Sequence, residues 1–270
     1  MATPNLRLPV VAGQFYPGSE AALRAELASY VVAAERKRYL GGLCPHAGYV
    51  YSGATAGELF GRLALPATVV LLGPKHHGAG ADFAVWPAGA WQTPLGEAPV
   101  NEEVAAAIIA GVGSAQADER AHLPEHSLEV VVPFVQYVNP QAAIVPIAVG
   151  PAAPQALFAA GEALAEALAP YRDDVVLVIS SDMTHYESVA AAERKDRLAI
   201  ERLEALDAEG LLEVVASHNV SMCGAWPAAA ALVALRGLGA SGGSLVRYAT
   251  SGEASGDYDQ VVGYAAVTFA

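Results

Sequence analysis

The run Val175-Val176-Leu177-Val178-Ile179-Ser180 leads directly into the polar turn Ser181-Asp182-Met183-Thr184-His185. An unbroken series of β-branched and aliphatic residues is typical of a strand that is covered on both faces of a parallel sheet. Residues 40–44, 68–72 and 143–149 form three more runs of this kind. The sequence therefore predicts four buried strands.

Stretches rich in Ala, Glu and Leu at helical spacing alternate with these runs. They predict helices at residues 19–36, 52–63, 101–111, 154–169, 189–206, 208–217 and 226–235. Asn101, followed by Glu102 and Glu103, fits a helix N-cap with acidic residues in the first turn. Apolar and polar residues alternate along residues 245–269, which predicts a hairpin or a pair of edge strands.

The alternation of strands and helices predicts an α/β fold, either a sandwich or a doubly wound sheet, around a mostly parallel central sheet. No low-complexity linker and no internal repeat divides the sequence. We therefore expect residues 1–270 to form a single-domain α/β sandwich.

Composition narrows the classes of function. The chain has 15 basic and 28 acidic residues and a net charge of −13, which argues against nucleic acid as a partner because phosphate binding needs clustered Lys and Arg. Hydrophobic residues make up 54% of the chain and charged residues 16%, enough to fill a large core. Two cysteines fit a reducing cytosol better than a disulfide scaffold, so a cytoplasmic location is expected.

Membrane and nucleotide partners are not expected. Residues 1–11 lack the basic patch and apolar run of a signal peptide. The uncharged residues 139–161 contain four prolines, which would break a membrane helix, so they predict a buried strand, a turn and a helix start. No Gly-x-Gly-x-x-Gly or Walker-type motif follows a predicted strand.

Three predicted strands each deliver a histidine at the carboxyl end. Strand 40–44 leads into Pro45-His46, strand 68–72 into Gly73-Pro74-Lys75-His76, and strand 175–180 into the turn that ends at His185. A single such histidine is more often a loop residue bonded to backbone. Three together predict a site, because ligands bind beyond the carboxyl ends of the strands in open α/β sheets.

Two further clusters could contribute to this site. Glu125-His126-Ser127 either adds to it or begins a helix, with Ser127 as cap and Glu129 as first-turn charge, and both interpretations can hold together. Cys223 precedes an Ala-rich helix, and a helix N-terminus tends to lower a thiol pKa, although a buried inert thiol is the alternative.

We expect structural roles for the second cysteine and for two further histidines. Cys44 falls inside a predicted strand, so we expect it in the core. His122 and His218 lie outside the polar turns, and each is expected to have a surface or capping role.

Two imidazoles and a thiolate, from His46, His76 and Cys223, would make a soft-to-borderline site for iron, copper or zinc. A catalytic metal needs an open position and a group nearby that moves a proton. The candidates for proton transfer are His185, His126 and Asp182, and Asp182 could instead orient an imidazole.

Seven ordered blocks give the chain a resemblance to a known family. They are residues 45–53 (PHAGYVYSG), 72–77 (LGPKHH), 93–96 (TPLG), 125–129 (EHSLE), 146–150 (PIAVG), 180–185 (SSDMTH) and 223–224 (CG). In this order they resemble the Memo family, which in bacteria and archaea includes the B component of the AmmeMemoRadiSam system. The resemblance spans nearly the whole chain.

The resemblance implies a fold similar to that of the class III, LigB-like extradiol dioxygenases, which use non-heme iron(II). It implies metal ligands at His46, His76 and Cys223, with Asp182 lining the pocket and His185 in the acid/base position. One departure concerns Cys223, which stands where the ring-opening enzymes have a carboxylate and so argues against inherited ring cleavage. Iron(II) is the expected metal, with copper second and zinc third.

Three interpretations stay open at this point. The chain is a metal-dependent oxidoreductase acting on a small molecule, or a non-catalytic metal carrier or peptide-binding module, or a protein whose polar turns merely cap the sheet. The AmmeMemoRadiSam context adds a radical SAM enzyme as an expected partner. The sequence identifies no substrate and no oligomeric state.

Overall fold

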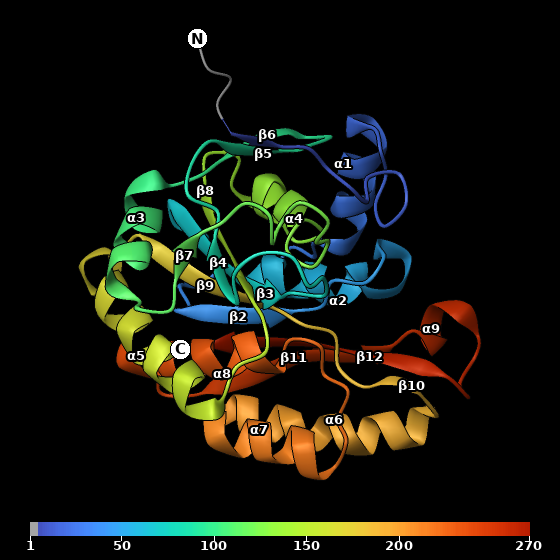
Figure 1. The fold of residues 1–270 in the computed structure, drawn as a ribbon. Helices are drawn as coiled ribbons and strands as arrows, with labels where there is room; N and C mark the ends of the chain where they lie inside the picture. The colour runs from blue at the N-terminus through green and yellow to red at the C-terminus, as the bar shows by residue number, and fades with distance from the viewer. Residues whose placement is uncertain (1–4) are drawn as a thin grey trace.

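A nine-stranded sheet lies between helices on both faces in the computed structural model, which describes residues 5–270 (Figure 1). Its centre is β2 (Gly41–Cys44), β9 (Val175–Ser180), β3 (Thr68–Pro74) and β8 (Ala143–Val149), all parallel in that spatial order. The α/β sandwich with a mostly parallel centre is therefore as predicted, and its four strands lie where the apolar runs place them.

The outer strands are short or antiparallel. On one side β8 is followed by β4 (Phe83–Val85) and β7 (Gln116–Ala117), and on the other β2 is followed by β12 (Val261–Phe269), which also pairs with β10 (His185–Glu187) and β11 (Gly243–Thr250). A separate small sheet contains β1 (Leu6–Arg7), β5 (Ala90–Thr93) and β6 (Gly96–Pro99).

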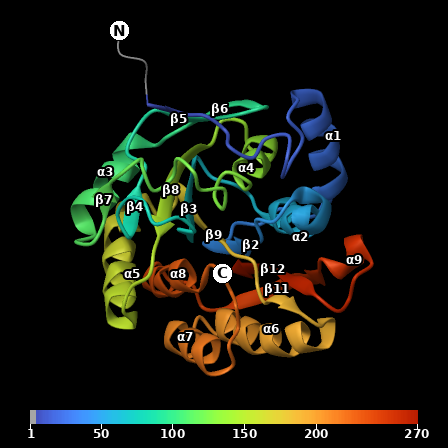
Figure 2. The ribbon, with the colours of Figure 1, turned by 45° about the vertical axis from the view of Figure 1, so that its right-hand side comes forward.

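Helices cover the two faces unequally. One face carries α1 (Glu20–Tyr30), α2 (Tyr49–Arg62) and α4 (Val132–Val138), and the short α9 (Gly252–Ser255) lies against α2. The other carries α5 (Pro154–Leu168), α6 (Val189–Glu204), α7 (Ala208–Ser217) and α8 (Ala225–Gly237), and α3 (Glu102–Gly111) packs beside α5. Figure 2 shows the sheet between the two layers from a second direction.

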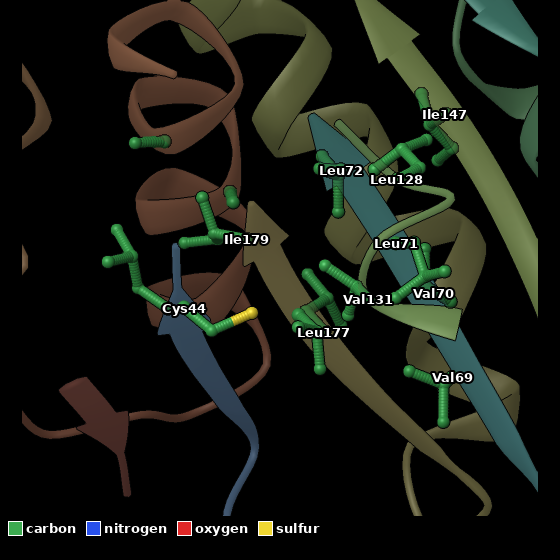
Figure 3. Close-up of a cluster of buried hydrophobic side chains, with 14 of the residues drawn as sticks. Cys44, Val69, Val70, Leu71, Leu72, Leu128, Val131, Ile147, Leu177 and Ile179 are labelled. Carbon is green, nitrogen blue, oxygen red and sulfur yellow. The ribbon is translucent and has the colours of Figure 1, made fainter. Parts of the chain in front are cut away.

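The core lies on both faces of the central strands. β3 and β9 are buried along their whole length, as expected for near-continuous apolar runs. Figure 3 shows Val69 to Leu72 of β3 with Leu177 and Ile179 of β9. Cys44, in the same cluster, is fully buried, which agrees with its predicted core role.

Helix α1 ends six residues earlier than predicted, at Tyr30 instead of residue 36. The chain leaves the helix to cross α2, where two glycines allow close backbone contact. A Cβ added to Gly57 would lie 2.3 Å from the Tyr30 carbonyl oxygen, and one added to Gly61 would lie 2.3 Å from that of Val32. Tertiary packing therefore overrides the local helix propensity of residues 31–36.

The C-terminal pair is antiparallel as predicted, but it is not a pair of edge strands. β12 pairs with β11 and also with β2, through Val267 opposite Leu43. Eight of its nine residues are buried, as expected for a strand that has a paired strand on each side.

The uncharged stretch 139–161 contains β8 and the beginning of α5, as predicted from its prolines. Across residues 5–270, no helix has both the length and the apolar character needed to cross a bilayer.

Candidate metal centre

The strand order brings the predicted site together. β2, β9 and β3 are neighbours in the sheet, with Cys44 opposite Ser180 in register. Because the strands are parallel, the turns carrying His46, Asp182 and His76 leave the same edge of the sheet.

His46, His76 and Cys223 offer ligand atoms that all lie within 4.8 Å of one another. Cys223 Sγ is 3.3 Å from His46 Nε2. The Cys223 loop, just before α8, approaches β9 closely because Gly224 has no side chain. A Cβ there would lie 2.5 Å from that of Ser181, whose Oγ accepts the Gly224 N–H at 2.9 Å.

Ser180, the last residue of β9, orients the His46 imidazole. Its Oγ donates to the Ser127 carbonyl at 2.7 Å and lies 2.7 Å from His46 Nδ1. Because the Ser180 hydroxyl donates its only proton to the Ser127 carbonyl, its Oγ must accept from His46 Nδ1–H. His46 Nε2 is then a bare nitrogen that faces Cys223. Sequence reasoning missed Ser180, although a hydroxyl at the end of an apolar strand was a signal.

Glu125 orients His76 in the same way. Its carboxylate accepts from the His76 backbone N–H at 2.6 Å and pairs with His76 Nδ1 at 2.8 Å. Burial lowers the His76 pKa, but the hydrogen bond and charge of Glu125 outweigh burial and raise it. Burial also acts on Glu125 and raises its pKa, but the hydrogen bond and the charge of His76 outweigh burial and lower the Glu125 pKa to about 2. His76 Nε2 is left free for a ligand role.

His76, Glu125 and His126 form a second group of ligand atoms within 4.8 Å. The Glu125 oxygens already accept from the Ser127 N–H at 2.9 Å as well as from His76. We therefore assign Glu125 to orienting His76 and not to holding a second ion.

The interpretation of Glu125-His126-Ser127 as a helix start is wrong, because α4 begins only at Val132. Ser127 Oγ donates to the Pro74 carbonyl at 3.0 Å instead of capping. Glu129 forms a buried ion pair with Arg7 at 2.7 Å and accepts from Tyr16 Oη at 2.8 Å. These long-range contacts replace the local ones that the pattern predicted.

His122 is not at the surface, which corrects its predicted role. It is fully buried between Trp86 and Trp91, with Nε2 3.1 Å from the Ala84 carbonyl oxygen. Burial lowers its pKa to about 4. His218 does have a capping role, as the C-cap residue of α7.

The Cys223 thiol agrees with the alternative of a buried thiol and not with a lowered pKa. Burial, together with the charge of Asp182, raises its pKa, although the residue does precede helix α8 as expected. Desolvation outweighs the helix terminus here. A bound metal cation would favour the thiolate again.

Asp182 is 5% exposed and accepts the His46 backbone N–H at 2.8 Å, so it orients the histidine loop. Its own N–H points to Cys223 Sγ at 3.2 Å. Burial raises the pKa of its carboxyl group. The carboxyl group therefore fixes the backbone of the His46 loop, whereas Ser180 and Glu125 orient the two imidazoles.

His185 has a fixed tautomer. Its Nδ1 lies 3.0 Å from the Ser221 carbonyl oxygen, which can only accept, so Nδ1 carries a proton and the neutral imidazole has its bare nitrogen at Nε2. Ser221 also accepts the His185 backbone N–H at 2.7 Å. A bare Nε2 is the nitrogen that a proton acceptor requires.

His126 stacks on His76 with ring centroids 5.0 Å apart. Burial and then the neighbouring His46 lower its pKa to about 4. His126, Asp182 and His185 line one cavity of about 420 Å³, so the structure brings the three proton-transfer candidates together.

A second cavity, of about 480 Å³, is lined in part by the Ser221–Cys223 segment. It is lined by His76, Cys223 and mainly apolar side chains, among them Leu212, Met222 and Trp226. Two of the three candidate ligands, His76 and Cys223, therefore line a mainly apolar cavity that is distinct from the one lined by His126, Asp182 and His185.

Fold and site together define an α/β sandwich protein with a candidate metal centre at the carboxyl edge of its parallel strands. The family model described as Memo-like protein matches residues 7–268. The chain belongs to the Memo family.

Similar proteins agree with this assignment. The MEMO1 family protein MK0963 of Methanopyrus kandleri is 42% identical, covering 97% of this chain and 98% of its own length. The MEMO1 family protein MTH_45 of Methanothermobacter thermautotrophicus is 39% identical, covering 96% of this chain and 99% of its own length. A MEMO1 family protein of Aquifex aeolicus is 40% identical, covering 98% of this chain and 99% of its own length.

One solved structure shares the fold at low identity. The uncharacterized protein JW3007 from Escherichia coli K12 superposes with a TM-score of 0.58 at 15% identity, covering 86% of this chain and 100% of that one. This likeness supports the α/β sandwich and is compatible with the LigB-like arrangement that the sequence resemblance implies.

Proposed function

We propose that this Memo-family chain is a metal-dependent oxidoreductase that holds iron(II), or copper in its place, on His46, His76 and Cys223. The observation that carries the proposal is the convergence of these three ligand atoms within 4.8 Å. Both imidazoles use Nδ1 in hydrogen bonds to protein groups, which leaves each Nε2 for the metal.

The donor set fits the expected metals. Two imidazoles and a thiolate suit iron or copper, with zinc third. Iron or copper would supply redox chemistry toward dioxygen or a small substrate when it is bound. We do not propose ring opening, because Cys223 stands where that reaction's metal triad has a carboxylate.

The protein groups around the site would move the protons. His185 Nε2 is the proton acceptor, since its Nδ1–H is committed to Ser221. Asp182 fixes the His46 loop and is a further candidate for proton transfer, and burial raises the pKa of its carboxyl group. His126, with a pKa of about 4, is neutral at pH 7 and can accept a hydrogen bond from a bound molecule.

A second candidate function is a non-catalytic metal carrier or a recognition module for a peptide or protein. The all-nitrogen-and-sulfur ligand group, without a carboxylate, favours it. In either case we propose a cytoplasmic protein, in keeping with its two free cysteines, that acts beside a radical SAM enzyme.

Metal analysis tests the proposal. Protein is purified under anaerobic, reducing conditions, and metal content is compared between wild type, His46→Ala and Cys223→Ala, with His218→Ala as a control histidine outside the site. Stoichiometric iron or copper that is lost only in the first two variants is expected. Wild type without metal, and without uptake on titration, would refute a metal centre.

Reactivity separates the two candidates. An oxidoreductase consumes dioxygen or a substrate in repeated turnovers, and His185→Gln slows this without changing metal content. A carrier gives no turnover and instead transfers its metal to a competing chelator.

A further inference from the structure

We infer that the cavity beside His185 and Asp182 receives a small organic cation, a compound that carries a protonated amine. The inference rests on the proposed function, because it takes this cavity to be the place where the substrate of the metal centre lies. It adds the chemical class of that substrate.

The lining of the cavity is aromatic and acidic. Phe15, Tyr51, Tyr186 and Tyr264 contribute rings, and Asp182 and Asp257 contribute carboxyl groups, around a volume of about 420 Å³. No Lys or Arg is among its lining residues. Aromatic rings attract cationic nitrogen through their quadrupoles, and carboxylates attract it through charge.

The residues around the cavity are also mainly acidic. The segment from α9 to β12 carries Glu253, Asp257 and Asp259. Arg247 reaches α9, but its guanidinium group is already bonded to Glu253 at 3.0 Å and to Glu58 at 3.2 Å. An anionic substrate would therefore meet acidic residues here with no Lys or Arg in the lining, whereas a cation meets complementary charge.

Tyr264 adds a hydrogen-bonding group to the lining of the cavity. It is only 2% exposed and lines the cavity. Within residues 5–270 its hydroxyl group makes no hydrogen bond to the protein. Because Tyr264 lines the cavity, its hydroxyl oxygen can accept an N–H from an ammonium group.

Three probes of matched size test the sign of the preferred charge. Phenethylamine is cationic, phenethyl alcohol is neutral and phenylacetate is anionic at pH 7. Their binding to the metal-loaded chain is measured by calorimetry and ligand-observed NMR. The amine is expected to bind about 5-fold more tightly than the alcohol, a ratio in the range of cation–π attraction, with phenylacetate weakest.

Two variants connect the preference to this cavity. Asp257→Asn keeps the Oδ1 acceptor of the Asp259 N–H, at 2.9 Å, while removing the charge, and should reduce the amine preference about 2-fold to 5-fold. Tyr186→Ala, at an exposed ring, should weaken amine binding about 3-fold. Asp173→Asn and Tyr171→Ala, which lie outside the cavity lining, are the matched controls and should change nothing.

Repeating the titrations with chelator-treated protein separates this inference from the proposed function. A preference for the amine that persists without metal supports the inference even if the metal analysis fails. The inference is overturned if the alcohol or phenylacetate binds as tightly as the amine, if the variants match their controls, or if no probe binds.

Discussion

The carboxylate of Glu125 collects the backbone N–H and the Nδ1–H of His76 and the backbone N–H of Ser127, although the residue is only 1% exposed. Ser180 gives His46 a comparable partner through its hydroxyl oxygen. Neither residue is in the three-ligand group, yet each fixes which imidazole nitrogen is free. Two predictions follow from these contacts.

Glu125→Gln should lower metal affinity about 10-fold to 100-fold, the usual effect of removing a carboxylate behind a ligating histidine. Metal titration with a competing chelator measures it. Glu26→Gln, a half-buried glutamate on α1, serves as the control. Unchanged affinity in Glu125→Gln would show that the orientation of His76 does not depend on this charge.

Ser180→Ala should lower metal affinity by a similar order, about 10-fold, because His46 Nδ1 loses its acceptor and the ring can adopt the other tautomer. Ser52→Ala removes an equally buried hydroxyl group, one that donates to the Ala47 carbonyl at 2.9 Å, and is the control for lost stability. Equal metal affinities in the two variants would contradict the assignment of Ser180.

At the scale of elements, strand β1 in the N-terminal segment is held against the loop that carries Glu125 by an ion pair and hydrogen bonds. Arg7 of β1 pairs with Glu129, donates to the carbonyl oxygens of His122 and Glu125, and lies 4.2 Å from the centre of the Trp91 ring. Both partners of the ion pair are 1% exposed.

Arg7→Met should therefore lower the free energy of unfolding by about 3–5 kcal/mol, because it leaves the Glu129 charge buried without its partner. Arg24→Met removes an exposed pair with Glu20 on α1 and should cost about 0.2–1 kcal/mol. Denaturant unfolding gives both values. A loss in Arg7→Met no greater than that in Arg24→Met would contradict the role of the buried pair.

Helix α6 contributes a pH-sensitive contact through Asp196, which accepts from the Thr184 N–H at 2.9 Å and from Tyr248 Oη at 2.7 Å. Burial raises its pKa above 3.8. A raised pKa means that the folded state binds the proton more tightly than the unfolded state, so stability falls as pH rises from 3.8 through the folded pKa.

Asp196→Asn lacks this titration, so its stability relative to wild type should increase as pH rises across that window. Denaturant unfolding at a series of pH values measures the difference. A difference that is flat with pH would show that Asp196 titrates alike in the folded and unfolded states.

Periodicity predicted the elements that are long and apolar. The bounds of β8, β9 and α7 match their predicted ranges, and the Asn101 side chain accepts the Val104 N–H as an N-cap should. The short strands β4 to β7 were not predicted, because two to four residues carry too little pattern. The true start of α4 was also missed, since the contacts of Glu129 lie with residues more than a hundred positions away.

At the scale of the whole molecule, the histidines at the strand ends could be grouped from sequence alone, because parallel strands end at one edge. The orienting groups Ser180, Glu125 and Ser221 could not, since their roles depend on which carbonyl or imidazole lies opposite. Three-dimensional register, and not local sequence, decides those contacts.

A metal bound at the proposed site should stabilise the entire chain, because the three proposed ligands come from distant parts of it: one follows β2, one follows β3 and one precedes α8. At a free metal concentration about 100 times the dissociation constant, binding contributes about 2.7 kcal/mol. Chelation should then lower the melting temperature by about 5–10 °C. Scanning calorimetry of wild type with and without chelator tests this, and Cys223→Ala should melt alike in both conditions.

The position of β12 in the sheet has a consequence for biosynthesis. β2 ends at Cys44, while its two neighbours begin at Val175 and Val261. At a translation rate of roughly 5–20 residues per second, β2 waits about 10–40 s on the ribosome before its second neighbour exists. Cys223 emerges late in that interval, so the proposed metal could be captured by all three ligands only when the chain is nearly finished. The nascent chain must also keep the edge of β2 from pairing with other strands until β12 is made.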